Sequence, residues 1–170
     1  MRLDPIKIAA YDLSWPAAFE RERVRVAKAL RPWLIGPVEH IGSTSVPGLA
    51  AKPIIDMLAR IDEYDSLDPS ALAEIGWVHA PEPHDAQDRK WSFCFPDPAW
   101  RTHHLHVVEH GSAGWPTWLA FRDHLRAHPA DAAEYGRIKV ALAEADDRGR
   151  PAYRAGKAPF IENILRRNAE

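Results

Sequence analysis

The 170-residue sequence is poor in the features that would place it in a specialised class of protein. It contains one cysteine, Cys94, which excludes an intramolecular disulfide, and it has no CxxC or Cys/His pattern of a structural zinc site. No apolar run approaches the roughly 18 residues that a membrane helix needs. The N-terminal residues MRLDPIKIAAYD lack the basic and then apolar layout of a signal peptide. We therefore expect a cytoplasmic protein that does not enter a membrane.

A basic excess is also missing. The 22 Lys and Arg residues are balanced by 24 Asp and Glu residues, for a net charge of −2 with nine neutral histidines. This balance lacks the global footprint of a nucleic-acid-binding protein, but it is compatible with a local basic pocket for a phosphate-bearing small molecule. Hydrophobic residues make up 46% and charged residues 27%, which argues against a disordered chain.

No internal repeat, low-complexity segment or Gly/Ser-rich linker divides the sequence. A chain of this length suits one domain with a real core. We predict a single domain over residues 1–170, with a sheet-containing core over residues 1–111 and C-terminal helices over residues 112–170.

The first half of the chain alternates between helical and strand patterns. Ser14 is a candidate N-cap, and Pro16 falls in the first turn of a helix predicted over residues 15–33. Strands are expected at residues 37–42 and 52–61, a short helix at residues 67–76, and an antiparallel strand pair at residues 89–97 and 101–111.

The second half is helical in pattern. Helices are predicted over residues 112–129, 130–147 and 157–170, and the segment GRPAYRAG at residues 149–156 is predicted to be a loop. This order of elements favours the α+β class, with a mixed β-sheet flanked by helices and a helical C-terminal part.

The segment HIGSTSVPGLAAKPIIDMLARI, residues 40–61, carries the first candidate site. Its Gly-Ser step follows a predicted strand, so backbone N–H groups and the hydroxyls of Ser43, Thr44 and Ser45 could hold a phosphate oxygen. Neither a P-loop nor a GxGxxG fingerprint is present. The alternative is a Ser-rich helix cap with no ligand.

Asp56 interrupts the apolar strand of the same segment. A carboxylate in such a strand is costly unless a cation or hydrogen-bond donors compensate for its lost hydration. A metal ion is one candidate, and magnesium suits a carboxylate combined with substrate phosphates. An Asp56 bonded to backbone amides, or paired with Lys52 or an arginine, is the structural alternative.

His104 and His106 alternate in a later predicted strand. Residues 104 and 106 point to one face of a strand, while Glu109 points to the other. Two imidazoles on one face could bind a metal ion, transfer protons or contact phosphate. A hydrogen-bonded polar face without a ligand is also compatible with the pattern, and the residues alone favour it slightly.

Four segments together resemble the GrpB family of small bacterial proteins. They are VEHIGSTSVPGLAAKPIIDMLARI, HHLHVVEHGSAGW, FRDHLRAHP and YRAGKAPFI, and they occur in order along nearly the whole chain. GrpB proteins are regarded as members of the nucleotidyltransferase superfamily, and similar domains occur fused to dephospho-CoA kinase. The resemblance therefore implies a nucleotidyltransferase-like fold.

The superfamily signature implies roles for residues of this chain. Ile41-Gly42-Ser43 matches its first half, and twelve residues lead on to Asp56 as the first acid. The second acid is replaced by Leu58, and the third would come from the strand that carries His104, His106 and Glu109. The implied metal ligands are Asp56, His104 and His106, with Asp56 and His106 as catalytic residues. Such a site would hold magnesium or manganese, and imidazole favours manganese or zinc.

The same resemblance implies a phosphate-binding set. Its members are Gly42, Ser43, Thr44, Ser45, Lys52 and Lys157, the last from the YRAGKAPFI motif. Lys90, Arg101 and Lys139 are further candidate cations. Trp91, Trp115 and Tyr153 could stack on a base, although aromatic residues more often pack in a core.

We expect a nucleotidyltransferase-like protein that binds a nucleotide or phosphorylated small molecule with a divalent metal and transfers a nucleotidyl group. One alternative is a degenerate, non-catalytic nucleotide or CoA-pathway binding module, which the replacement of the second acid by Leu58 favours. Another is a metal-dependent hydrolase or phosphotransferase that uses His104 and His106.

Overall fold

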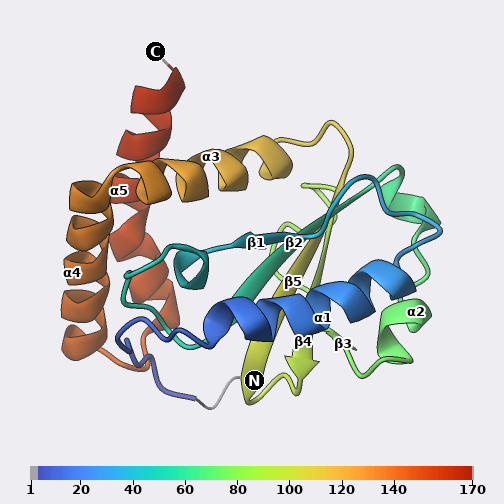
Figure 1. Ribbon diagram of the computed structural model, residues 1–170, viewed down its shortest axis with the longest axis horizontal. Helices are drawn as coiled ribbons and strands as arrows, with labels where there is room; N and C mark the ends of the chain where they lie inside the picture. The colour runs from blue at the N-terminus through green and yellow to red at the C-terminus, as the bar shows by residue number, and fades with distance from the viewer. Residues whose placement is uncertain (1–3, 170) are drawn as a thin grey trace.

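A mixed five-stranded sheet forms the centre of the computed structural model, which describes residues 4–169 (Figure 1). The strands are β1 (Glu39–Ile41), β2 (Ile55–Ile61), β3 (Val78–His79), β4 (Lys90–Pro96) and β5 (Arg101–Glu109). Their spatial order is β1-β2-β5-β4-β3. The β2–β5 pair is parallel, and the other neighbouring pairs are antiparallel. A parallel pair needs a long crossover, and the chain from α2 through β4 provides it.

Helices surround this sheet and make up the C-terminal part of the chain. They are α1 (Trp15–Ala29), α2 (Ser70–Ala73), α3 (Gly114–Ala127), α4 (Pro129–Ala145) and α5 (Arg150–Ala169), with short 3-10 helices η1 (Ser43–Ser45) and η2 (Tyr64–Ser66). The predicted α+β class and mixed sheet are confirmed. Within residues 4–169, no helix combines the length and the apolar character that crossing a bilayer requires.

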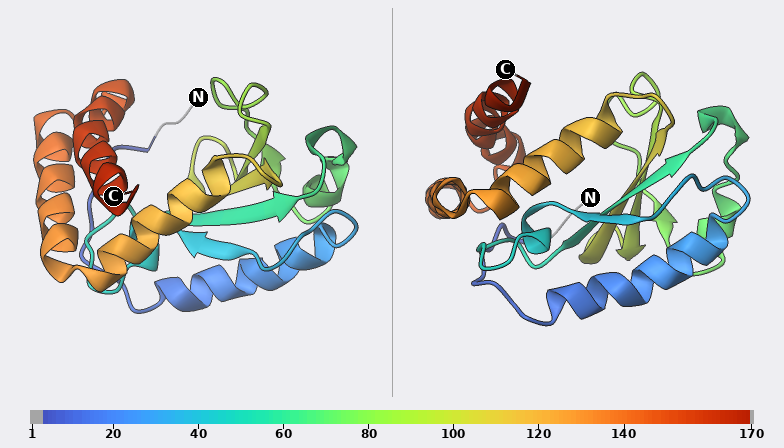
Figure 2. Two further views of the ribbon diagram at one scale, coloured as in Figure 1. Left: turned by 90° about the horizontal axis from the view of Figure 1, so that it is seen from above. Right: turned by 45° about the horizontal axis from the view of Figure 1, so that its top comes forward.

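The two faces of the sheet have different partners. On one face, alternate residues of β2, β4 and β5 such as Met57, Phe93 and Leu105 are buried in a core with Val26 and Leu30 of the α1 segment. The opposite face carries a smaller cluster that packs against α3. Figure 2 shows α1 and α3 on opposite sides of the sheet, with α4 and α5 beside one end of it. The candidate site residues lie on the α3 face.

Several predicted elements are shorter in the structure than the sequence suggests, among them the first helix and the second strand. The first helix ends at Ala29 instead of residue 33, because Pro32 lacks the N–H that an α-helix would need there. The second strand starts at Ile55 instead of residue 52, since the N–H of Ile54 closes a tight turn on Lys52 O around Pro53. Ser14 occupies the N-cap position, but its side chain makes no capping hydrogen bond.

The loop predicted over residues 149–156 is wrong, because α5 begins at Arg150. Its Pro151 lies in the first turn of the helix, where a missing N–H is tolerated. Gly156 lies closely against α4: a Cβ at this position would lie 2.5 Å from Cδ2 of Leu142, whose side chain would have to move. The glycine therefore marks a close helix–helix approach and not a turn. The two-residue edge strand β3 was also missed.

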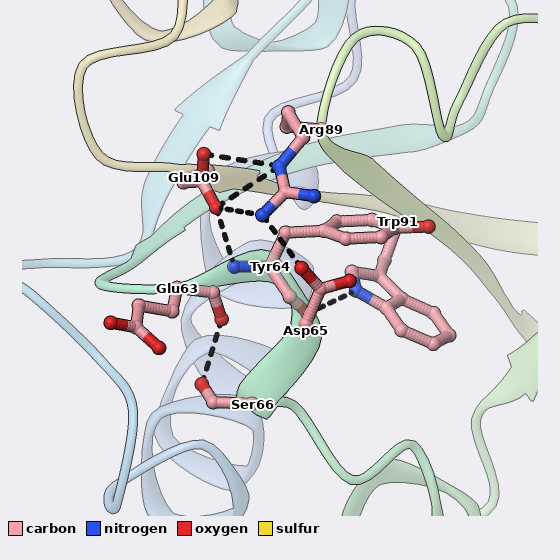
Figure 3. A network of polar contacts seen from close by, with 7 residues as sticks. All are labelled: Glu63, Tyr64, Asp65, Ser66, Arg89, Trp91 and Glu109. Carbon is pink, nitrogen blue, oxygen red and sulfur yellow. Dashed lines mark hydrogen bonds and ion pairs between the residues drawn. The ribbon is translucent and has the colours of Figure 1, made fainter.

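A polar network joins the C-terminal ends of β2 and β5 (Figure 3). Glu109 accepts hydrogen bonds from the Arg89 guanidinium and, at 2.8 Å, from the backbone N–H of Tyr64. Arg89 also pairs with Asp65 at 2.9 Å, and Trp91 Nε1 donates to Tyr64 O at 3.1 Å. These bonds hold η2 against β4 and β5. Side chains alternate along β5, so Glu109 lies on the face opposite His104 and His106, and these bonds occupy it there.

Candidate metal and phosphate site

The turn after β1 lies directly against Asp56. Gly42 has φ +71°, and a Cβ at this position would be 2.5 Å from Asp56 Oδ2. The left-handed backbone and the close approach both require glycine. Antiparallel pairing sets Ile41 opposite Asp56, so the register of β1 and β2 fixes the turn beside the carboxylate.

The parallel pairing of β2 with β5 adds the two histidines. His104 lies opposite Asp56 in the register, and His106 follows on the same face. His104 Nδ1 is 3.7 Å from Asp56 Oδ1, and the ring centroids of His104 and His106 are 4.3 Å apart. One donor atom from each of the three residues lies within 4.8 Å of the other two. This is the spacing of a group that can share one metal ion.

The chemistry of these donors fits a metal ion. His106 Nδ1 is buried and has no hydrogen-bond partner among residues 4–169, an arrangement that is costly without a ligand. Burial, with His104 and Lys90 nearby, holds the pKa of His106 well below its usual value. Its imidazole is therefore neutral, which is the form that binds metals. One carboxylate and two imidazoles suit manganese or zinc better than magnesium.

Glu82 lies on the far side of His104 from Asp56. Its Oε1 is 3.6 Å from His104 Nε2, and its other oxygen is 3.3 Å from Lys90 Nζ. A carboxylate behind a ligating imidazole orients the ring and raises its basicity. Glu82 is therefore placed to support His104 as a ligand through Nδ1.

The three donors line a cavity of about 520 Å³. Its wall comes from the turn after β1, the segment before β2, strands β2 and β5, and helices α3, α4 and α5. Four of the lining residues are cations: Lys52, Lys139, Arg154 and Lys157. Asp56 and Glu82 are the acids among the lining residues, so basic groups outnumber acidic ones and the cavity favours an anionic ligand. A larger hollow of about 870 Å³ lies between residues 46–50 and α4, but it contains none of the candidate metal ligands.

Lys139 is the most deeply buried of these cations. Its side chain comes from α4, and its Nζ donates to Ser43 Oγ at 2.7 Å and to Ala50 O at 2.5 Å. Burial, together with Lys157 and Lys52, lowers the pKa of Lys139 to about 7. Lys139 therefore binds its proton weakly, and an anionic ligand in the cavity would strengthen that binding.

Tyr153 lies between the other two lysines. Lys157 Nζ is 4.5 Å and Lys52 Nζ is 5.0 Å from the centroid of its ring. Burial lowers the pKa of Lys157 and raises the pKa of the Tyr153 hydroxyl. The ring holds both ammonium groups at the cavity by cation–π contacts.

The hydroxyls of the predicted phosphate loop have different positions. Ser43 lines the cavity and contacts Lys139. Thr44 also lines the cavity, but its Oγ1 bonds to His40 Nε2 at 2.9 Å and to Ile54 O at 3.4 Å. Ser45 is outside the lining, and its Oγ donates to Gly42 O at 2.5 Å, which closes the turn. Ser43 is thus the hydroxyl of this turn that a ligand can reach without breaking a structural bond to the backbone.

Position 58, where the sequence comparison with the superfamily signature expects a second acid, is closed off from the cavity and from solvent. Leu58 is fully buried and belongs to a cluster with Ile41 and Val108, beneath Trp115 and Trp118 of α3. A second metal next to this strand would require α3 to move. The arrangement therefore supports one metal position.

Several candidate residues lie outside the cavity lining. Arg101 donates to Pro98 O at 3.2 Å, and Lys90 pairs with Glu82 and with Asp85. Trp91 belongs to the opposite face, where it stacks with Tyr64. Trp115 lies under the Arg60 guanidinium, 4.6 Å from its centroid. Of the aromatic candidates, Tyr153 reaches the cavity.

Several lining residues were not singled out from the sequence, among them Glu82, Trp118, Tyr135 and Arg154. Arg154 adjoins Tyr153 in the YRAGKAPFI motif, so the motif itself was a signal for it. Trp118 packs against His106 in a tilted arrangement, with ring centroids 4.4 Å apart. Glu82 lies in an irregular segment, and no local pattern distinguishes it from other surface acids.

Comparison with known proteins agrees with this architecture. A family model described as GrpB protein matches residues 5–167. A UPF0157 protein of Halalkalibacterium halodurans is 34% identical, over 95% of this chain and 82% of the relative. A dephospho-CoA kinase of Mycolicibacterium paratuberculosis is 28% identical, over 96% of this chain and 46% of the kinase.

A solved structure extends the likeness to three dimensions. The crystal structure of conserved protein GrpB from Enterococcus faecalis superposes with a TM-score of 0.83 at 32% sequence identity, over 96% of this chain and all of that one. The family model covers nearly the whole chain, and the fold agrees with it. The chain therefore belongs to the GrpB family.

Proposed function

We propose that the cavity binds a nucleotide or another phosphorylated small molecule together with one divalent metal ion, and that it transfers a nucleotidyl group. The observation that supports this most directly is that the cavity combines a three-donor metal group with four cations around the Gly42–Ser43 turn. A metal-bound phosphate ester needs both features, since the metal and the basic side chains share the neutralisation of its charge.

Each part of the site has a distinct task in this proposal. Asp56, His104 and His106 hold the metal ion, which would polarise a phosphate oxygen and neutralise charge on the leaving group. Gly42 lets the backbone approach the phosphates, and Ser43 lies where a phosphate oxygen would be bound. Further lining cations, from the segment before β2 and from α5, bind the remaining phosphate oxygens.

The proposal includes a nucleotidyltransferase-like fold whose site holds one metal ion instead of two. The spacing from Gly42-Ser43 to Asp56 is that of the superfamily signature, and the Gly42 turn contacts the acid directly. With Leu58 sealed beneath α3, the site has one metal position, and its imidazoles favour manganese or zinc.

Calorimetric titration of ATP, GTP, CTP and UTP with manganese or magnesium tests this function. Wild type should bind a nucleotide more tightly with manganese than with magnesium, and Asp56→Ala should lose at least about tenfold in affinity. Asp62→Ala is the matched control, because Asp62 is an exposed carboxylate beyond the end of β2. Equal weak binding by wild type and Asp56→Ala would refute the proposal.

A second candidate is a binding module that keeps the cavity but does not transfer a group. The sealed Leu58 favours it, as does the similarity of this chain to about half of a dephospho-CoA kinase. This candidate predicts nucleotide binding in calorimetry with no pyrophosphate or nucleotidyl product on prolonged incubation. Release of inorganic phosphate that is lost in His106→Ala would instead favour a metal-dependent hydrolase.

A further inference from the structure

The contact between Ser43 and Lys139 has a geometry that phosphate binding alone does not require. Lys139 Nζ lies 2.7 Å from Ser43 Oγ and also contacts the Ala50 carbonyl. Lys139 is 2% exposed, and both of its hydrogen-bond partners are uncharged. A buried lysine held against a serine hydroxyl by neutral groups resembles a base in position to take the hydroxyl proton.

The backbone presents Ser43 to the cavity. The chain leaves β1, turns sharply at Gly42 with φ +71°, and begins η1 at Ser43. Hydrogen bonds to backbone carbonyls engage the neighbouring hydroxyls of Thr44 and Ser45. The Ser43 hydroxyl is the one that faces both the ligand space and an amine.

The surroundings of Lys139 favour the neutral form of its amine, which is the form that can accept a proton. Burial, then Lys157 of α5 and Lys52 of the segment before β2, lower the pKa of Lys139 to about 7, while Asp56 of β2 acts in the opposite direction. The Tyr135 ring of the same helix lies 4.8 Å from Nζ and favours the charged form. A neutral amine can accept the Ser43 proton while it still donates to Ala50 O.

We propose that Ser43 is a nucleophile, that Lys139 is its general base, and that Ser43 Oγ takes a phosphoryl or nucleotidyl group from a phosphoanhydride in the cavity. Ser43 Oγ forms a bond to phosphorus, the phosphoanhydride P–O bond breaks, and the Oγ proton moves to Lys139 Nζ. The leaving group departs as pyrophosphate or as a nucleoside diphosphate, according to which phosphorus is attacked. The product is a phosphoester on Ser43, available for transfer to an acceptor.

This inference rests on the proposed function for its electrophile, because the cations of the cavity wall are what would bring a phosphoanhydride to Ser43. The nucleophile itself does not depend on a nucleotide or a metal. The two claims can therefore be tested separately.

A fluorophosphonate probe tests the nucleophile on the metal-free full chain. Attack by an activated serine forms the Oγ–P bond and releases fluoride, and peptide mapping by mass spectrometry locates the adduct. We expect Ser43 to be labelled, no adduct at that peptide in Ser43→Ala, and at least about 100-fold slower labelling in Lys139→Gln. Ser66→Ala and Lys28→Gln are matched controls, since Ser66 ends the other 3-10 helix and Lys28 is exposed on α1.

Two further measurements separate a base from a structural lysine. Lys139→Arg keeps the charge and the donors but cannot act as a base, so it should label as slowly as Lys139→Gln. In wild type, the labelling rate should rise with pH around a midpoint near 7, a test that needs no variant to fold. Labelling of Ser43 at equal rates in wild type and both Lys139 variants would overturn the inference, as would a pH-independent rate in wild type.

ATP labelled in either the α or the γ phosphate, supplied with manganese, identifies the transferred group. Label retained on Ser43 after denaturation shows nucleotidyl transfer if it came from the α phosphate and phosphoryl transfer if it came from the γ phosphate. ATP that binds in calorimetry but leaves Ser43 unmodified would overturn this inference and leave the proposed binding function intact. ATP that does not bind would refute the proposed function, while the fluorophosphonate result would still decide whether Ser43 is a nucleophile.

Discussion

At the scale of single residues, Gly42 is the position where backbone geometry and site chemistry depend on each other most closely. Its positive φ and its contact with Asp56 are separate requirements, and each alone would favour glycine. Gly48 offers a comparison within the same loop, because it also has a positive φ, +81°, but has open space where a Cβ would lie.

Gly42→Ala should therefore affect the site more than Gly48→Ala does. Both changes should lower the free energy of unfolding by about 1–3 kcal/mol through backbone strain. Only Gly42→Ala should also displace Asp56 and weaken manganese binding, by about tenfold or more. Chemical denaturation and metal titration of the two variants measure the two effects. Equal manganese affinity in both variants would contradict the role of Gly42.

Lys139 should make stability depend on pH in an unusual direction. Its pKa is about 7 in the folded protein and 10.5 ordinarily, so between these values the unfolded chain binds the extra proton. The free energy of unfolding should therefore rise with pH in this range, and the cost of burying the charge is fully present only below pH 7. Relative to Lys139→Met, wild type should gain about 1–2 kcal/mol between pH 7 and 9. If the difference in free energy of unfolding between wild type and Lys139→Met does not change with pH, the pKa of Lys139 is not lowered in the folded protein.

The sequence indicated part of this site and could not indicate the rest. The Gly42–Asp56 relation follows from a spacing within one local segment, and the alternation of His104 and His106 follows from the period of a strand. Lys139 could be named only as one of several candidate cations, and Glu82 could not be singled out, because the direction in which a helix or loop turns its charged residues depends on tertiary packing. A surface cation and a buried cation look alike in the local sequence.

At the scale of elements, the parallel pairing of β2 with β5 decides which side chains meet. Asp56 is opposite His104, and Leu58 is opposite His106. The first pair faces the cavity, while Leu58 two residues further on is covered by α3. Strand β2 therefore contributes the candidate ligand Asp56 near its start and the core residue Leu58 further along.

Restoring an acid with Leu58→Asp should not restore a second metal position. Leu58→Ala should cost about 2–5 kcal/mol through the lost packing, and Leu58→Asp should cost more because it buries a carboxylate beneath Trp118. Manganese affinity should be no higher in Leu58→Asp than in Leu58→Ala. Tighter metal binding by Leu58→Asp would show that α3 opens readily and that the site accepts a second acid.

The elements that the sequence predicted best are those with long periodic patterns. Strands β4 and β5, helix α3, and the break between α3 and α4 near residue 129 occur where they were expected. The start of α5 was not predicted, because Gly149, Pro151 and Gly156 suggest a loop when read locally. In the structure a helix accommodates them: Pro151 lies in the first turn of α5, and Gly156 lies where α5 contacts α4.

At the scale of the whole molecule, two buried histidines are held without charge between the sheet and α1. His40 stacks on Phe19 of α1 with ring centroids 4.6 Å apart, and His103 bonds to Ala18 O at 3.2 Å. Burial lowers the pKa of His40 to about 4 and also lowers the pKa of His103. The fold therefore carries an intrinsic sensitivity to acid.

Acid should destabilise the protein through these histidines. Below pH 6.5 the unfolded chain takes up protons that the folded protein does not, so stability present above pH 6.5 is lost as pH falls toward 4. His40 alone should account for about 3 kcal/mol of this loss. Denaturant titrations between pH 7 and 4.5 should show a smaller loss in His40→Gln than in wild type, whereas a variant of the exposed His84 should behave like wild type. Parallel curves for wild type and His40→Gln would contradict the assignment.

The bond between Ser43 and Lys139 joins positions 96 residues apart, and α5 then closes the same cavity from still later in the chain. During synthesis, α4 and α5 emerge only after the Gly42 turn and β2 have been made. The wall of the cavity is therefore complete only when these late helices have docked against that turn, and a molecule that binds there would report their docking.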